Sequence, residues 1–224
     1  MKTANYLAFQ GPQFAVLSED QLHKLHLGAL EVLRRTGIRF HHEGALEMLE
    51  AAGAFVSDGN LVRFPARLVD EALASVPERV VMCDRDGDPA MHLEGQNVYF
   101  GTGSDCLNLL DHETGEVRKF TRDDLVDAYR LCDALDNIHF VMSVGIPEDV
   151  DSELAYDAQM ALMLEHTTKP IVFVTDNLAT CRRAIDMAAA VAGGHEALRE
   201  QQHILLYSEP SSPLQQSETA VDKL

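Results

Sequence analysis

The sequence predicts an α/β fold in which a helical N-terminal region precedes repeated strand–helix units, and two observations carry this prediction. From residue 121 onward, short and almost entirely apolar runs alternate with segments of helical periodicity. Strands that are apolar on both faces and joined by helices indicate a parallel sheet covered on both sides. Residues 1–78 lack this alternation and carry short helical patterns instead. A TIM-type barrel and a doubly wound sheet both fit the alternation.

Residues 1–78 form a small helical cap in this prediction. Ser18 and Gln21 fit a capping box, and leucines then recur at helical spacing. A second helix is expected over residues 43–52, and Pro65 suits the first turn of a third helix. The region carries no recognisable catalytic motif, so we place the site elsewhere.

Residues 79–120 are richer in β-forming side chains than the segment before them. Five short strands are expected here, at 80–83, 91–93, 98–100, 107–110 and 117–120. The last two flank the polar run 111–116, which is typical of a hairpin loop. Together these segments predict a small antiparallel sheet.

The strand–helix alternation begins at Thr121, which suits the N-cap of a helix. Strands are expected at 138–142, 171–174 and 204–207, and helices at 121–135, 151–165, 177–192 and from 214 onward. No stop signal closes the last helix, so we expect a truncation within it. Residues 79–224 would then be the first half of a barrel domain with about four strand–helix units, since a barrel needs eight units in ~250 residues.

Polar residues follow the ends of the predicted parallel strands, where ligands bind in such folds. The candidate substrate-binding residues are Ser104, Asp105, Asp176, Tyr207 and Glu209. Carboxylates and an aromatic face suit a positively charged ammonium group. Each residue also has a structural explanation: the two aspartates as turn or helix-cap residues, and the tyrosine as part of the core.

Composition narrows the function classes. The net charge is −18, from 36 acidic and 18 basic side chains, which disfavours nucleic acid and anionic membranes as partners. A cationic small molecule fits this charge, although solubility is the better explanation when charge is the only evidence. The four cysteines form no C-x-x-C pair, and three of them lie within apolar patterns as small core hydrophobes. This usage fits a reducing cytosol, so a cytoplasmic location is expected.

Targeting and membrane signals are not found in the sequence. No apolar h-region of a signal peptide follows residues 1–5, and no apolar run approaches the ~18 residues of a membrane span.

Two weaker motifs are set aside. The glycines at 101 and 103 suggest a dinucleotide loop, but Cys106 stands where the third glycine belongs, so the fingerprint fails. His23 and His26 could share a helix face and bind a metal ion, yet a solvated face explains them better. We therefore predict no metal site.

Several segments together resemble the N-terminal half of the trimethylamine methyltransferase family. They are 99–105 (YFGTGSD), 110–116 (LDHETGE), 134–143 (ALDNIHFVMS), 167–172 (TTKPIV) and 209–214 (EPSSPL). The resemblance extends from about residue 17 to residue 224 and rests on the order and spacing of these segments.

This resemblance implies a TIM barrel that transfers a methyl group from a methylated amine to the cobalt of a corrinoid. The amine would be trimethylamine or a quaternary amine such as glycine betaine, and the corrinoid would be carried by a separate protein. By their position at strand ends, and not by the resemblance, Asp105, Tyr207 and Glu209 are our candidates for holding the ammonium group. Gly101 and Gly103 would let the backbone pass close to the corrinoid or substrate. The resemblance assigns no catalytic residue.

Two other functions stay open at this stage. The chain could be a non-catalytic module that binds a quaternary amine, or an inert fragment, because half a barrel leaves open strand edges. A homo-oligomer is also compatible with the sequence.

Overall fold

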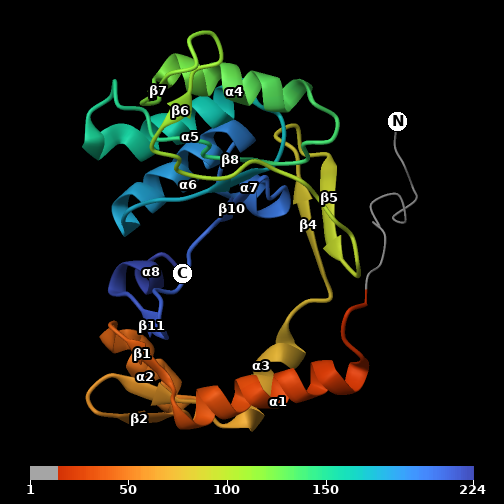
Figure 1. Cartoon of the computed structure of the whole chain (residues 1–224), viewed down its shortest axis with the longest axis vertical. Helices are drawn as coiled ribbons and strands as arrows, with labels where there is room; N and C mark the ends of the chain where they lie inside the picture. The colour runs from red at the N-terminus through yellow and green to blue at the C-terminus, as the bar shows by residue number, and fades with distance from the viewer. Residues whose placement is uncertain (1–14) are drawn as a thin grey trace. The chain divides into compact units, whose positions relative to one another are not determined.

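The computed structural model describes residues 15–224, which divide into two compact units (Figure 1). The prediction about residues 1–5 lies outside the described part. The larger unit contains residues 78–207, and the smaller unit contains residues 15–77 and 208–224. Residues 208–224 thus group with the N-terminal segment, whereas the sequence suggested a simple division at residue 78. Each unit is described by itself.

The smaller unit is a mixed α/β structure. Its elements are α1 (Glu19–Arg35), β1 (Ile38–Phe40), α2 (Glu43–Ala51), β2 (Phe55–Ser57), β3 (Leu61–Arg63), α3 (Ala66–Ser75), β11 (Gln215–Gln216) and α8 (Glu218–Asp222). The strands form one sheet in the order β11-β1-β3-β2, in which only the β1–β11 pair is parallel. The three predicted helices are confirmed, including the capping box of Ser18 and Gln21.

The helix predicted from residue 214 onward is wrong. Gln215 and Gln216 instead form β11, which pairs with Arg39 and Phe40 of β1. The helix α8 begins only after Ser217, whose side chain accepts a hydrogen bond of 3.1 Å from the Ala220 amide. A partner strand about 175 positions earlier in the chain, which local periodicity does not reveal, therefore sets this segment's conformation.

The larger unit is built on three parallel strands. They are β8 (Val141–Met142), β9 (Ile171–Phe173) and β10 (Ile204–Leu206), in the spatial order β10-β9-β8. Its helices are α4 (Arg122–Ala134), α5 (Ala155–His166), α6 (Leu178–Ala192) and α7 (His195–Glu200), with a 3-10 turn at Ser152–Leu154. The α/β class is confirmed, but the strands among residues 15–224 do not close into a barrel.

Helices α4, α5 and α6 lie side by side along the strands (Figure 1). Buried side chains from the strands and helices form one core, which includes Leu125, Tyr129, Val141, Met160, Met163, Ile171, Phe173 and Ala188. Asn177 caps the start of α6, and Gly193, with φ of 92°, ends it in the left-handed conformation. Both signals were readable in the sequence.

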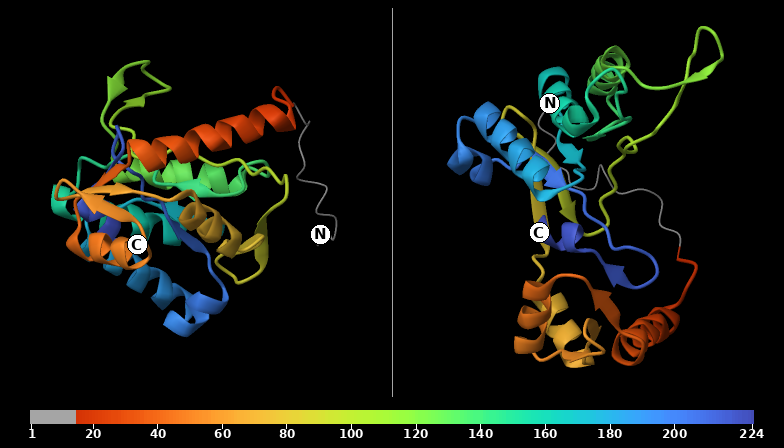
Figure 2. Two further views of the ribbon diagram at one scale, coloured as in Figure 1. Left: turned by 90° about the horizontal axis from the view of Figure 1, so that it is seen from below. Right: turned by 90° about the vertical axis from the view of Figure 1, so that its left-hand side faces the viewer.

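The region before α4 forms two separate hairpins and not one small sheet. The strands β4 (Arg79–Cys83) and β5 (Pro89–Glu94) pair with each other, as do β6 (Leu109–Leu110) and β7 (Val117–Arg118). Figure 2 shows the β6–β7 hairpin projecting from the larger unit. Arg118 holds this hairpin to α4, since it bonds Asp111 within the hairpin loop and both carboxylate oxygens of Asp124.

The strand predicted at 98–100 is not formed. The chain instead follows the edge of β8 through single parallel bridges, Gly101 with Phe140 and Cys106 with Gly145. Between these bridges, the Thr102 hydroxyl accepts the Met142 amide hydrogen bond at 2.7 Å. A side chain therefore replaces a backbone carbonyl beside β8, and the ladder of a regular strand is lost.

No helix among the described residues is long and apolar enough to cross a membrane.

Candidate functional site

The centre of the candidate site is a hydrogen bond between Ser143 and Asp105. Ser143 directly follows β8, and its Oγ donates to Asp105 Oδ1 at 2.6 Å. Ser143 is only 1% exposed, whereas Asp105 is half-buried. Asp105 has a φ of 52°, a left-handed conformation that Asp tolerates better than most residues. The 101–106 segment therefore presents a carboxylate at the carboxyl end of the sheet.

Both edges of the backbone after β8 are occupied. On one edge, the Val144 carbonyl accepts the Cys106 amide at 3.1 Å, and the Ile146 amide donates to the Cys106 carbonyl at 3.2 Å. On the other edge, Gln159 Nε2 from α5 donates to the carbonyls of Ser143 and Gly145 at 3.4 and 2.5 Å. Ser143 is thus held on both sides.

Tyr156, at the start of α5, lies within electrostatic reach of both Asp105 and Asp176. Burial raises the pKa of the Tyr156 hydroxyl, and the negative charges of Asp105 and Asp176 raise it further. Asp176 lies just beyond β9, whereas Asp105 lies in the 101–106 segment on the other side of β8, and the charges of both raise the pKa of the same phenol. Two negative charges beside an aromatic ring are the surroundings that an ammonium ion prefers.

Tyr129, on α4, is a second tyrosine within electrostatic reach of Asp105. Its side chain is fully buried, and its hydroxyl has no hydrogen-bond partner among the described residues. Burial raises the pKa of this hydroxyl, and the charge of Asp105 adds to the effect. The electrostatic influence of Asp105 therefore extends to both tyrosines.

A pocket of about 400 Å³ opens beside Tyr156. Its lining is mainly apolar, with an ion pair between Lys119 and Glu148 at 3.8 Å, and comprises Leu107, Lys119, Ile146, Pro147, Glu148, Val150, Ser152, Ala155 and Tyr156. Tyr156 therefore belongs both to this pocket and to the surroundings of the carboxylates. An apolar pocket next to an anionic corner suits a cation that carries methyl groups.

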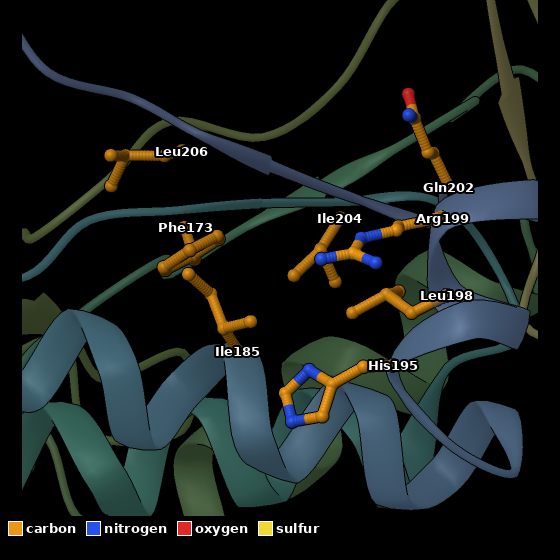
Figure 3. Close-up of a pocket in the computed structure, with 8 residues that line it drawn as sticks. All are labelled: Phe173, Ile185, His195, Leu198, Arg199, Gln202, Ile204 and Leu206. Carbon is orange, nitrogen blue, oxygen red and sulfur yellow. The ribbon is translucent and has the colours of Figure 1, made fainter. Parts of the chain in front are cut away.

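A second pocket, of about 350 Å³, lies against β10, α6 and α7 (Figure 3). Figure 3 shows Phe173, Ile185 and Ile204 around its apolar interior, with His195 and Arg199 nearby. No carboxylate lines this pocket, so it does not suit an ammonium group. Among residues 15–224, no group of three or more His, Cys, Asp or Glu side chains could hold a metal ion.

The structure places the predicted site residues unequally. Asp105 and half-buried Ser104 lie at the strand end, and exposed Asp176 acts on Tyr156 with Asp105. Asp176 is also within electrostatic reach of Arg183, whose pKa is raised mainly by its hydrogen bonds to Asp157. Because this nearby cation partly offsets the charge of Asp176, Asp105 is the better placed carboxylate.

Tyr207 and Glu209 have different positions from each other. Tyr207 follows β10, its amide donates to the Phe173 carbonyl at 2.8 Å, and its side chain is 44% exposed, so its interpretation as a core residue is wrong. Glu209 belongs to the smaller unit, whereas the other four candidate residues belong to the larger one. Asp176 is not a helix cap, because Asn177 caps α6.

The two glycines also differ. An added Cβ at Gly101 would lie 2.3 Å from the Phe140 ring, so close packing inside the chain already requires a glycine there. Gly103 is exposed and has nothing within 4 Å of an added Cβ. A role in contacting a corrinoid stays a prediction for both.

Sequence reasoning missed three polar residues of the site: Tyr129, Tyr156 and Gln159. Leu154, just before α5, is 53% exposed, and the buried positions of the helix include Ala155, Gln159 and Met163. Their spacing of four residues places a glutamine on a buried apolar stripe. That polar residue within the stripe was the signal available in the sequence.

Comparison with known proteins gives a consistent result. The family model described as trimethylamine methyltransferase (MTTB) matches residues 1–224. The chain is 31% identical to trimethylamine methyltransferase MttB of Desulfitobacterium hafniense (strain DSM 10664 / DCB-2) over 96% of this chain and 44% of that protein. It is 24% identical to the glycine betaine methyltransferase of D. hafniense (strain Y51) over 95% of this chain and 44% of that protein.

A third relative is the L-carnitine:corrinoid methyltransferase of Eubacterium limosum, 29% identical over 69% of this chain and 32% of that protein. The chain therefore spans less than half the length of these relatives. The match over its whole length shows that the chain belongs to the trimethylamine methyltransferase family.

Proposed function

We propose that this protein transfers a methyl group from a methylated amine to the cobalt of a corrinoid carried by a separate protein. The amine is trimethylamine or a quaternary amine such as glycine betaine. The observation that carries the proposal is the Asp105 carboxylate, held after β8 by the Ser143 hydroxyl at 2.6 Å, together with the mainly apolar pocket that Tyr156 lines. Family membership supports the reaction class, since the relatives compared above are methyltransferases named for amines of this kind.

In this proposal the protein binds and orients the amine. Asp105, held by Ser143, attracts the positive nitrogen, while the ring of Tyr156 contacts its methyl groups. An aromatic ring contributes about 0.5–2 kcal/mol to holding such a cation. Ser104, Asp176 and Tyr207 are proposed as further contacts around it.

The chemical step needs little from the protein besides orientation. The C–N bond breaks, its electron pair stays on the nitrogen, and the methyl group passes to reduced cobalt, which supplies the electron pair of the new bond. A quaternary ammonium is already activated as a leaving group, whereas trimethylamine needs protonation or another activating group. Correct alignment of donor and acceptor is then the main catalytic contribution.

The strand order supports the barrel part of the proposal. The segment 101–106, β8, β9 and β10 lie next to one another in chain order and are parallel. A TIM barrel requires this consecutive order, whereas a doubly wound sheet reverses direction at a switch point. In a barrel, Gly101 and Gly103 would lie at the face from which the corrinoid approaches.

Calorimetry on the protein as its gene encodes it tests the binding half of the proposal. The probes are glycine betaine and tert-butylacetate, which has the same shape but a carbon in place of the charged nitrogen. We expect glycine betaine to bind at least tenfold more tightly, because only it has the charge that Asp105 recognises. Trimethylamine is titrated in parallel, and failure of both amines to bind more tightly than tert-butylacetate would contradict the proposal.

A further inference from the structure

Gln159 is an unusual residue for its position, because it is a polar side chain in the buried interior of α5. It is 1% exposed, and its Nε2 donates to the carbonyls of Ser143 and Gly145. These carbonyls belong to the strand end that holds Asp105. The amide group therefore connects the helix to the candidate site.

The alternating directions of the backbone hydrogen-bonding groups along β8 explain why this amide is needed. The Val141 amide donates to the Pro170 carbonyl at 3.0 Å. The backbone N–H and C=O groups of the odd-numbered residues of β8 therefore point toward β9. Pairing between β8 and β9 ends at Met142 and Val172, and no further pair with β9 is formed at Ser143 or Gly145. Gln159 takes the place that a continuing β9 would occupy.

Because Gln159 replaces β9 as the hydrogen-bond partner of these carbonyls, β8 and β9 can separate where a ligand would bind. After Phe173, the chain leaves the sheet and reaches the cap of α6 at Asn177. Without Gln159, the carbonyls of Ser143 and Gly145 would lose their donor, and buried carbonyls are rarely left unpaired. The backbone at Gly145 is also packed tightly, because an added Cβ there would lie 2.5 Å from the Phe120 ring.

The orientation of the amide is also fixed. If it were reversed, its oxygen would face two carbonyl oxygens, so the nitrogen must point toward them. Gln159 Oε1 is then a buried acceptor with no hydrogen-bond partner among the described residues. It can accept a hydrogen bond from a water molecule or from another donor that enters the site.

We propose that Gln159 is a positioning residue: it fixes the backbone at 143–145 so that Ser143 Oγ holds the Asp105 carboxylate toward the amine. This inference rests on the proposed function for the identity of the ligand. Gln159 itself neither carries charge nor takes part in the reaction. Its effect passes through the Ser143 backbone and hydroxyl to Asp105.

The experiment compares Gln159→Leu and Gln159→Glu in the protein as its gene encodes it. For Gln159→Leu we expect about tenfold weaker binding of the preferred amine at every pH, because the donor is lost. For Gln159→Glu, the introduced carboxyl group can donate a hydrogen bond only while protonated, and burial raises its pKa. Amine binding by this variant should approach that of the wild type at acid pH and weaken as pH rises through that pKa.

The matched controls are Gln202→Leu and Gln202→Glu, at an exposed glutamine before β10 in the same unit. Neither should change amine binding. Hydrogen exchange gives a readout that does not need an amine: the amides of Cys106 and Ile146 should lose protection in Gln159→Leu, whereas the Ile171 amide keeps it. These amides report on the backbone pairing beside the site.

Wild-type affinity and unchanged exchange in both Gln159 variants would overturn the inference. So would weakened binding by Gln159→Glu with no dependence on pH, because that is the result of a general packing defect. If Gln159→Leu does not fold, the pH dependence of Gln159→Glu still decides. If the wild type binds no methylated amine, the proposed function fails, and the exchange of Cys106 and Ile146 alone decides whether Gln159 positions this strand end.

Discussion

The Ser143 hydroxyl lies 2.6 Å from a carboxylate oxygen of Asp105, and this hydrogen bond joins two segments that are 38 residues apart. Replacing the serine by alanine removes the donor and leaves the carboxylate free to turn. A hydrogen bond to a charged group is worth about 1.5–3 kcal/mol. Because only part of this energy contributes to amine binding, through the alignment of the carboxylate, we expect Ser143→Ala to weaken amine binding about threefold to tenfold. Calorimetry measures the affinity, with Ser75→Ala in α3 as the control. An affinity equal to that of the wild type would contradict the role given to Ser143.

Asp105→Asn separates the charge of Asp105 from its backbone conformation. Asparagine also tolerates the φ of 52°, so the melting temperature should stay close to the wild-type value. Amine affinity should fall at least tenfold. The pKa of Tyr156 should fall toward its ordinary value but stay above it, because burial is the larger cause of its raised pKa. Tyrosine titration followed by NMR checks this, and an unchanged Tyr156 pKa would show that Asp105 does not act on that ring.

Replacing Tyr129 or Tyr99 by phenylalanine should have different effects on the free energy of unfolding. Tyr129→Phe removes a buried hydroxyl that has no partner among the described residues, so the free energy of unfolding should stay constant or rise by about 1 kcal/mol. Tyr99→Phe removes a hydroxyl that accepts the His92 amide at 2.8 Å, and should destabilise the protein by a similar amount. Denaturant titrations at neutral pH compare the two.

Tyr129 also predicts how stability changes at alkaline pH. Its raised pKa means that the folded protein keeps this proton longer than the unfolded chain does. The associated stability is present below the unfolded pKa of about 10 and is lost as pH rises above it. Tyr129→Phe should therefore show a shallower loss of stability above that pH than the wild type. Parallel pH profiles of the two proteins would contradict this assignment.

Two glycines of the opening segment should differ in their tolerance of alanine. Gly101→Ala would place a methyl group 2.3 Å from the Phe140 ring and should cost about 1–3 kcal/mol of stability. Gly103→Ala meets nothing within 4 Å and should unfold like the wild type. If Gly103 passes close to the corrinoid, this stable variant will still transfer methyl groups more slowly. Thermal melts and transfer rates of both variants separate packing from function.

Arg118 should control the order of the β6–β7 hairpin. Its hydrogen bonds hold the pKa of Asp124 well below the ordinary range. The pKa of Asp111 is also lowered, first by a hydrogen bond from the Thr114 backbone amide and next by the hydrogen bond from Arg118. The stabilisation from these carboxylates is present above their unfolded pKa of about 4 and is lost as pH falls below it. Relative to β9 as an internal reference, residues 109–118 should exchange hydrogen faster in Arg118→Met at neutral pH than in the wild type at neutral pH. The wild type at acid pH should show the same relative increase. Unchanged exchange in Arg118→Met would show that the ion pairs do not order the hairpin.

Local signals predicted the helices well because their ends are determined by nearby residues. The capping box of Ser18 and the N-cap at Thr121 are found as the sequence indicated, and α6 ends at Ala192, where the sequence predicted its end. The segment 98–100 and β11 depended on partners distant in the chain, Phe140 for the adjoining Gly101 and the β1 strand for β11, so their local patterns were misleading.

The candidate site was only half predictable for the same reason. Strand-end position selected Asp105 and Asp176, because the rule depends only on the order of strands and loops. Tyr156 and Gln159 lie on a helix that packs beside those ends, and their role depends on which way α5 faces. A 3-10 turn at Ser152–Leu154 precedes α5, where the sequence predicted one continuous helix from residue 151.

The most direct test of the account is methyl transfer by the protein as its gene encodes it, measured beside Asp105→Asn. The assay supplies a reduced corrinoid protein and, in turn, trimethylamine, glycine betaine and carnitine, and follows methylation of the cobalt by absorbance. The account predicts methylation with at least one amine, and a rate at least tenfold lower for Asp105→Asn at subsaturating amine. No methylation with any of the three amines, or equal rates for the two proteins, would contradict it.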